Sequence, residues 1–183
     1  NQITTRMVNI VYPAKEPGET KLATVNAISG DMLKHIQSEY LASIARGNLP
    51  LCQGCSLVRG SRILDDPEFM KDLPAKDSEV IDRLIQRCAV DGIEGNLIAI
   101  AKGNRSIPRK SVAEFGWMIG IPDVTTTESY FHVRFAQERG EAEAGQAGQA
   151  IFHRPANSGV YAVVASFEVA RIGFNDITRT YPV

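Results

Sequence analysis

Side chains that could contact phosphate gather at the start of one predicted helix, where Ser29 is followed by Asp31, Lys34 and His35. The free backbone N–H groups of a helix N-terminus bind anions, and the Lys and His side chains add further donors. Asp31 could shape such a site, or could act as a general base on a ribose 2′-hydroxyl. The same residues also suit an ordinary solvated helix face, so this helix alone leaves both interpretations open.

A second candidate is a basic stretch, residues 102–110, which holds four Lys or Arg residues and no acid. Gly and Pro within it favour a loop, and Arg109, Lys110 and Ser111 offer donors that suit phosphates rather than bases. A charge run is usually a solvated surface. Because no acid within the stretch neutralises it, we favour contact with nucleic acid.

Residues 125–132 combine hydroxyls, aromatic rings and a histidine after Pro122. The hydroxyls of Thr125 and Thr126 could donate to phosphates, and the aromatic residues beside His132 could stack on bases of a single strand. An ordinary β-hairpin also explains the pattern, and it is the favoured interpretation when the stretch is taken alone.

The three cysteines could belong to a metal site. Cys52-x-x-Cys55 and Cys88 could supply three zinc ligands, and His35 is a candidate for the fourth. A second Cys-x-x-Cys pair is missing, and Cys88 also fits the apolar face of a helix, so we expect no metal and no cofactor. An odd, small number of cysteines argues against a secreted disulfide framework and predicts a reducing, cytoplasmic location.

Signatures of common enzyme classes are absent from the sequence. It has no Walker A motif, no Gly-x-Gly-x-x-Gly motif after a strand, no His-Glu-x-x-His and no Gly-x-Ser-x-Gly. Their absence argues against an NTPase, a dinucleotide enzyme, a zinc protease and an α/β-hydrolase. No apolar run reaches about 18 residues, so we expect no membrane partner.

Charge is unevenly distributed, although the 183-residue chain has a net charge of only -1. Residues 65–94 hold nine acids and four bases, a net of -5, whereas residues 102–110 have a net of +4. We therefore expect one surface to hold nucleic acid and an acidic surface to pack against a neighbouring copy. Raised salt would then weaken assembly.

Two helices are predicted to position these residues. Apolar residues spaced by four along residues 28–44 predict the first helix, which Ser29 would cap and Gly47 would end. Its opposite, polar face carries the candidates for phosphate contact. The second helix covers residues 77–88, and the intervening residues 48–76 predict an irregular insertion.

Strand-like patterns cover residues 7–12, 25–28, 96–100, 112–121, 130–135, 150–152 and 160–169. The last is a near-continuous apolar run, which predicts a central strand buried on both faces. Residues 138–149 are small or polar and predict a mobile loop. The order of the elements predicts an α+β domain whose sheet is covered by helices on one face.

Several segments, in order, resemble one protein family. Residues 27–35, Ala-Ile-Ser-Gly-Asp-Met-Leu-Lys-His, resemble the Ser-Gly-x-x-x-Lys-His helix start of DevR-like CRISPR-associated proteins. These are the crRNA-binding backbone subunits of Cascade-type (type I) effector complexes. Further similar segments are Thr4-Thr5-Arg6, Cys88-x-x-Asp91-Gly92, Arg109-Lys110-Ser111, Glu114-Phe115-Gly116, and residues 151–154, 158–162 and 171–175. The ordered series, rather than any one motif, carries the resemblance.

The resemblance implies a modified RRM-like (ferredoxin-like) palm that forms a single domain over residues 1–183. It implies a finger-like insertion at residues 48–76 and a thumb-like insertion at residues 122–150. It also implies a further C-terminal segment, beyond Val183, that would finish the palm.

The function implied by the resemblance is that of a non-catalytic scaffold for CRISPR RNA. The protein would polymerise along crRNA with other copies of itself and other CRISPR effector subunits, and would displace bases at intervals to present the guide to target nucleic acid. The alternative is a backbone endoribonuclease that cuts target RNA with Asp31. The RNA-binding residues implied are Arg6, Ser29, Asp31, Lys34, His35, Arg109, Lys110, Thr125, Thr126 and His132.

Overall fold

The computed structural model describes residues 6–100, 104–135 and 149–182. The chain divides into two compact units. The first unit comprises Asn1–Ser29 and Trp117–Val163, and the second comprises Gly30–Gly116 and Val164–Val183. Most of the predicted mobile loop, residues 138–148, lies outside the described residues.

The first unit is an antiparallel sheet of four strands in the order β1-β2-β6-β7. Its strands are β1 (Met7–Pro13), β2 (Thr20–Ile28), β6 (Met118–Phe135) and β7 (Gln149–Ala162). β1 pairs with β2 along its whole length, whereas β2 pairs with β6 only at Ala27 and Ile28. The strand predicted at residues 7–12 is confirmed, and the extended piece predicted at residues 25–28 is the end of a longer strand.

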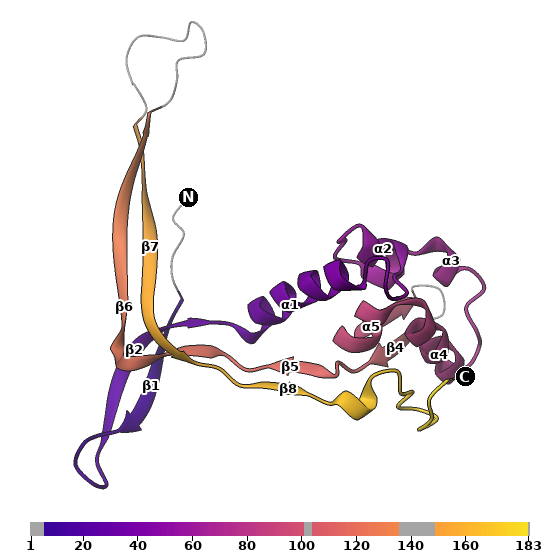
Figure 1. The fold of residues 1–183 in the computed structure, drawn as a ribbon, viewed down its shortest axis with the longest axis horizontal. Coiled ribbons are helices and arrows are strands. Elements are labelled where there is room, and N and C mark those ends of the chain that lie inside the picture. Colours follow the sequence, from indigo (N-terminus) through magenta and orange to yellow (C-terminus); the bar gives the residue numbers. More distant parts are fainter. Residues whose placement is uncertain (1–5, 101–103, 136–148, 183) are drawn as a thin grey trace, which may run out of the picture. The chain divides into compact units, whose positions relative to one another are not determined.

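β6 and β7 form a long hairpin (Figure 1). Pairing is continuous from Thr125↔Gly159 to Phe135↔Gln149, but before it residues 121–124 of β6 lie opposite a single residue of β7. At this bulge Gly159 has a φ of 128°, and a Cβ there would lie 2.2 Å from the Val124 carbonyl oxygen. Only glycine fits this position. Residues 125–132 are therefore part of a β-hairpin, as the simpler interpretation predicted.

The second unit contains the helices and two short antiparallel ladders. Its elements are α1 (Gly30–Ala45), α2 (Gln53–Ser56), η1 (Arg62–Asp65), α3 (Pro67–Met70), α4 (Asp77–Arg87), α5 (Ala89–Glu94), β3 (Asn96–Ile100), β4 (Arg105–Arg109), β5 (Ala113–Phe115), β8 (Ala165–Phe167) and η2 (Val169–Arg171). β3 pairs with β4, and β5 pairs with β8. Both predicted helices and the strand predicted at residues 96–100 are confirmed. The predicted irregular insertion holds only the short turns α2, η1 and α3.

The hydrophobic core of the second unit forms around α4. Val80, Ile81 and Leu84 lie on one face of this helix and are buried in the same cluster as Ile98 of β3 and Ile107 of β4. Acidic residues in the first turn of α4 and a basic residue in its last turn complement the helix dipole. The apolar periodicity that predicted this helix therefore also identified its buried face.

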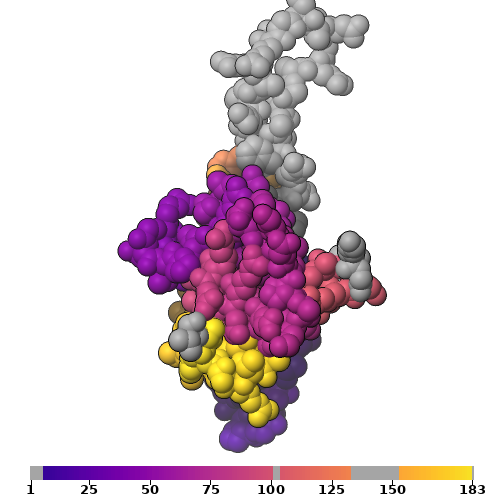
Figure 2. Space-filling model, turned by 90° about the vertical axis from the view of Figure 1, so that its right-hand side faces the viewer, coloured from indigo at the N-terminus to yellow at the C-terminus, as the bar shows by residue number. Residues whose placement is uncertain are grey.

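The C-terminal segment is attached to α4 by a buried asparagine. The side-chain amide of Asn175 donates a hydrogen bond to the Ser78 carbonyl oxygen at 2.9 Å, and its Oδ1 accepts one from the Ile177 N–H at 2.9 Å. Figure 2 shows this segment, in yellow, against the magenta helical surface. It therefore covers part of the helical core.

The apolar stripe of α1 is exposed rather than buried. Met32, Ile36, Tyr40 and Ile44 all face solvent in the chain, whereas the buried residues of α1 are Gly30, Ala42 and Ala45 on the opposite side. The spacing by four correctly predicted a helix, but its inward face is the one with small residues, of which Gly30 approaches Phe115 of β5 and Ala42 packs in the core cluster.

The apolar run at residues 160–169 is not a central strand, so this prediction is wrong. β7 ends at Ala162, β8 occupies only Ala165–Phe167, and the large apolar residues of the run are exposed: Val160, Val163, Val164, Phe167 and Val169. The boundary between the two units falls inside the run, after Val163. The run is therefore divided between two sheets and cannot be buried on both faces of one.

The architecture is α+β with antiparallel sheets, which confirms the predicted fold class and is compatible with an RRM-like palm. The predicted finger, residues 48–76, lies in the second unit, and the described part of the predicted thumb, residues 122–150, lies in the first. The single-domain description and these boundaries stay predictions.

Among the described residues, no helix is long and apolar enough to span a bilayer.

Candidate functional site

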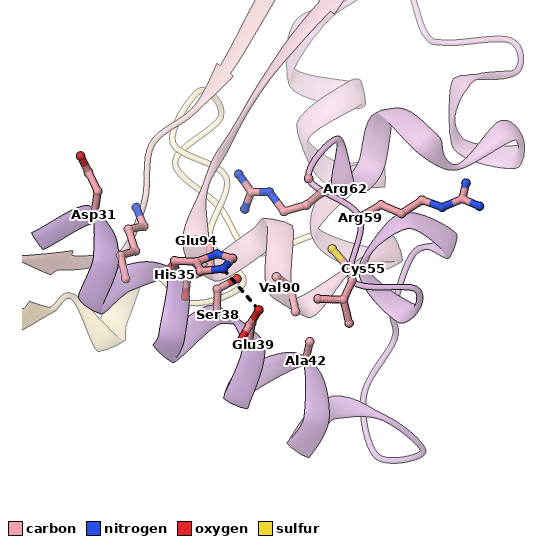
Figure 3. Close-up of a pocket in the computed structure, with 13 residues that line it drawn as sticks. Asp31, His35, Ser38, Glu39, Ala42, Cys55, Arg59, Arg62, Val90 and Glu94 are labelled. Carbon is pink, nitrogen blue, oxygen red and sulfur yellow. Dashed lines mark ion pairs between the residues drawn. The ribbon is translucent and has the colours of Figure 1, made fainter. Parts of the chain in front are cut away.

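α1 turns its polar face toward a cavity of about 280 Å³ in the second unit (Figure 3). Asp31, Lys34 and His35, three of the residues predicted to contact phosphate, line it. The other lining residues come from α1, from residues 55–62 and from α5: Ser38, Glu39, Ala42, Cys55, Val58, Arg59, Gly60, Arg62, Val90 and Glu94. Ser29 immediately precedes α1 and does not line the cavity.

Close packing positions α1 at this cavity. A Cβ on Gly30 would lie 2.1 Å from the Phe115 carbonyl oxygen in β5, so no side chain fits there. Ala42 and Ala45 are buried farther along the helix. Lys34 lies one turn after Gly30 and therefore on the same face of α1. The contact between Gly30 and β5 thus helps to place the Lys34 side chain at the cavity.

The cavity rim offers cations that a phosphate could contact. Lys34 is half-buried, and the Arg59 side chain is 55% exposed with its guanidinium 3.9 Å from the Asp65 carboxylate. Such long, exposed pairs contribute little, so Arg59 can exchange this partner for another anion. His35 lies on the same side of α1, with its Nε2 3.3 Å from Oε1 of Glu39 (dashed in Figure 3).

Glu94 is the buried acid of the cavity wall. The residue is only 3% exposed, and neither carboxylate oxygen has a hydrogen-bond partner of normal geometry among the described residues. Burial raises the pKa of Glu94, and the positive charge of Lys34 opposes this effect. Lys34 at the rim therefore interacts electrostatically with the buried Glu94 carboxyl group in the cavity wall.

Acids from distant parts of the sequence neutralise much of the basic stretch at residues 102–110. The guanidinium of Arg105 pairs with Asp77 at 2.6 Å, and Lys110 Nζ lies 3.6 Å from a Glu114 oxygen. The expectation that this stretch has no compensating acid is therefore wrong: Asp77 and Asp176 reach Arg105 and Arg109 through tertiary contacts, and Glu114 lies four residues after Lys110. The expected loop is largely a strand, β4, and residues 102 and 103 lie outside the described residues.

Arg109 is a buried structural cation rather than an exposed donor. Its residue exposure is 3%, and its N–H groups donate to the carbonyl oxygens of Gly92, Arg171 and Phe174 and to the Asp176 carboxylate. These five hydrogen bonds use every N–H of the guanidinium. Arg109 therefore has no N–H left for a phosphate, whereas the Lys110 side chain is 66% exposed.

The first unit carries the remaining predicted RNA-binding residues. Arg6 lies over the Trp117 ring at 5.5 Å, and Thr125 donates to the Val160 carbonyl oxygen at 2.8 Å. Thr126 shares a hydrogen bond with the Ser158 hydroxyl, and His132 is exposed on β6. These residues belong to the unit that holds the four-stranded sheet, whereas in the second unit Asp31, Lys34 and His35 line the cavity and Arg109 and Lys110 do not.

A family model described as CRISPR-associated negative auto-regulator DevR/Csa2 matches residues 1–183. The chain belongs to the DevR/Csa2 family. Membership confirms the resemblance that the ordered motifs carried, and it gives the protein a general role in CRISPR defence. No curated protein matches the sequence.

Three cavity residues of this DevR/Csa2 protein escaped the sequence reasoning: Arg59, Arg62 and Glu94. The two arginines flank a Gly-Ser pair inside the irregular insertion, and this basic, small-residue pattern was a signal that could have identified them. Glu94 ends a short helix and has no comparable signal. Only its burial beside Lys34 distinguishes it from other acids.

The three cysteines of this DevR/Csa2 protein form a cluster with the carboxylate of Asp91, which the sequence did not predict as a metal ligand. The ligand atoms of Cys52, Cys55, Cys88 and Asp91 all lie within 4.8 Å of one another, and all four residues are buried. Burial and then the negative charge of Cys88 raise the pKa of Asp91 to about 6. His35, which the sequence offered as a candidate for the fourth ligand, does not belong to this cluster, and its exposed side chain pairs with Glu39.

Proposed function

We propose that this DevR/Csa2 protein binds CRISPR RNA through its phosphates and assembles along it in several copies. In this role it is the backbone subunit of a Cascade-type interference complex and a scaffold rather than a nuclease. The observation that carries the proposal is the convergence of the polar face of α1 and the basic segment at Arg59 and Arg62 on one cavity.

The geometry of this cavity supports phosphate contact without base reading. Lys34 and His35 lie on the first turns of a 16-residue helix, where the dipole and the free N–H groups favour an anion. Arg59 approaches the same space from a different segment of the chain. Cations from two directions can contact successive phosphates of an RNA backbone, and the described residues that line the cavity include no Phe, Tyr or Trp on which a base would stack.

The β6–β7 hairpin supports a second type of contact in the first unit. Phe131 is 68% exposed, and its ring lies 4.5 Å from the His153 ring on the neighbouring strand. Tyr130 is also exposed, with its hydroxyl bonded to Glu128. Exposed rings on a projecting hairpin suit the displacement or stacking of bases in single-stranded RNA.

Charge reversal at the cavity rim tests the proposal. Lys34→Glu combined with Arg59→Glu should lower the amount of RNA that copurifies with the chain, because each reversal replaces a phosphate partner with a repelling charge. The slope of the logarithm of the binding constant against the logarithm of the salt concentration should become shallower by about 0.7 for each phosphate that the variant no longer neutralises. Filter binding with a crRNA-length single strand at several salt concentrations measures both.

Lys71→Glu combined with Lys76→Glu is the matched control, since it also reverses two cations, at exposed sites outside the cavity. The proposal fails if the double variant, folded by circular dichroism, keeps the RNA content and salt slope of the control. RNA cleavage by the unmodified chain that disappears in Asp31→Ala would replace the scaffold with the endoribonuclease.

A further inference from the structure

The thiol cluster has the composition and closeness of a tetrahedral metal site. In a Zn²⁺ site with bonds of about 2.3 Å to sulfur and about 2.0 Å to oxygen, neighbouring ligand atoms lie roughly 3.5–3.8 Å apart. Here Oδ2 of Asp91 lies 3.4 Å from Cys52 Sγ and 3.3 Å from Cys55 Sγ. The four ligand atoms can therefore surround one ion after small side-chain movements.

Two short chain segments each contribute a pair of ligands three residues apart. Cys52 caps α2, and its sulfur accepts the backbone N–H of Cys55 at 3.3 Å. Between them, a Cβ on Gly54 would lie 1.9 Å from the Arg62 carbonyl oxygen, so the turn tolerates only glycine. Cys88 ends α4 and Asp91 lies in the first turn of α5. The pairs thus come from ordered, capped helical turns.

The carboxylate of Asp91 is oriented by groups that do not belong to the cluster. Oδ1 accepts a hydrogen bond from the Asn96 side-chain amide at 2.6 Å and lies 3.8 Å from Arg62 Nε. Oδ2 is thereby turned toward the thiols. Outer partners that fix a ligand in this way are characteristic of metal sites, because they hold the ligand atom in place before the ion arrives.

Packing in the hydrophobic core alone does not explain why a carboxylate is buried beside the three cysteines. Asp91 has no exposed surface, and an ionised carboxylate in a dry core is costly unless a cation compensates it. Arg62 is the nearby cation among the described side chains, but it contacts the oxygen that points away from the thiols. Among the described residues, no Lys or Arg pairs with the oxygen that faces the sulfurs, and none of the three cysteines forms a disulfide.

We propose that Cys52, Cys55, Cys88 and Asp91 bind a structural Zn²⁺ ion. Three sulfurs favour Zn²⁺ over Mg²⁺ or Ca²⁺, and four protein ligands close the coordination sphere so that no position remains for a substrate. On binding, each thiol that coordinates the ion releases its proton to solvent. The ion joins the segment that carries Arg59 and Arg62 to α5, which carries Glu94, and so it holds two walls of the cavity together.

Metal content of the full chain tests the site directly. The protein is purified under reducing conditions, loaded with ZnCl₂ and dialysed into metal-free buffer. Elemental analysis by inductively coupled plasma mass spectrometry should find one zinc ion per chain. Titration with CoCl₂ should give the visible absorption of tetrahedral Co²⁺ and a thiolate-to-cobalt charge-transfer band. A folded, reduced chain that keeps no stoichiometric zinc and gives no such spectrum would overturn the proposal.

Two variants identify the fourth ligand. Asp91→Asn should weaken Co²⁺ binding by at least the roughly 10–100-fold loss typical when even an outer partner of a metal ligand is removed, and should alter the visible spectrum. His35→Ala, which removes the competing candidate, should change neither. The assignment of Asp91 fails if the spectrum and affinity respond to His35→Ala but not to Asp91→Asn.

Discussion

Two buried carboxylates show how their neighbours decide the cost of burial. Asp66 accepts backbone N–H bonds from Gln53 and Phe69 and a two-pronged pair from Arg87, with bonds of 3.0 and 3.1 Å. Burial raises its pKa, but Arg87 and these N–H groups more than offset this, so the pKa of Asp66 lies below its ordinary value. Among the described residues Glu94 has no such hydrogen-bond partners, and burial raises its pKa. These two carboxylates are both buried, but their pKa values shift in opposite directions, so their contributions to stability depend on pH in opposite ways.

Glu94→Gln tests this difference through the pH dependence of stability. A raised carboxylate pKa means that the folded state holds the proton more tightly, so the contribution of Glu94 is complete below pH 4.5 and is lost as pH rises through the folded pKa. Glu94→Gln should therefore raise the free energy of unfolding at pH 7 and have little effect at pH 4. Thermal melts at several pH values measure the gain. Glu16→Gln, the same change at an exposed residue outside the cavity, is the matched control.

At the scale of elements, α1 is an amphipathic helix whose apolar stripe faces solvent in this chain. Its inward face is built from glycine and alanine, which let the helix approach β5, and from polar residues that line the cavity. The stability of the second unit should therefore depend on α4 and its neighbours rather than on the α1 stripe.

Substitutions on the two helices separate these contributions. Ile36→Ser and Ile44→Ser should each change the free energy of unfolding by less than about 0.5 kcal/mol, as is usual for exposed positions. Leu84→Ala on α4, where the side chain is fully buried, should cost about 2–5 kcal/mol. Urea denaturation measures all three. If Ile44→Ser costs as much as Leu84→Ala, then the stripe is buried in solution.

At the scale of the whole molecule, charges that are separate in the sequence meet in the fold. Arg105 from the basic stretch pairs with Asp77 from the acidic segment, and Arg109 joins α5 to the C-terminal segment. These ion pairs neutralise, within one chain, part of the opposite charge that would otherwise attract a neighbouring copy. The acidic contact with a neighbouring copy stays a prediction that must rest on the remaining charges.

Arg109→Met should be destabilising rather than specifically harmful to RNA binding. Removing the buried cation leaves the carbonyl oxygens of Gly92, Arg171 and Phe174 without its N–H donors, while Asp176 keeps its hydrogen bonds from Arg171. Because each buried carbonyl oxygen left unpaired costs free energy, the expected loss is about 3–5 kcal/mol. Arg105→Met removes a more exposed pair and should cost about 1 kcal/mol or less. Urea denaturation gives both values. Unchanged stability together with weaker RNA binding of folded Arg109→Met would restore Arg109 as a phosphate contact.

The sequence by itself determined the features that depend on neighbouring residues. Spacing by four predicted α1 and α4, and ordered short motifs identified the family. The tertiary structure alone decided which face of α1 turns inward, which acids neutralise Arg105 and Arg109, and that Asp91 rather than His35 completes the thiol cluster. Periodicity follows from the local geometry of the backbone. Burial, charge pairing and metal ligation depend on side chains that the fold brings together from distant segments.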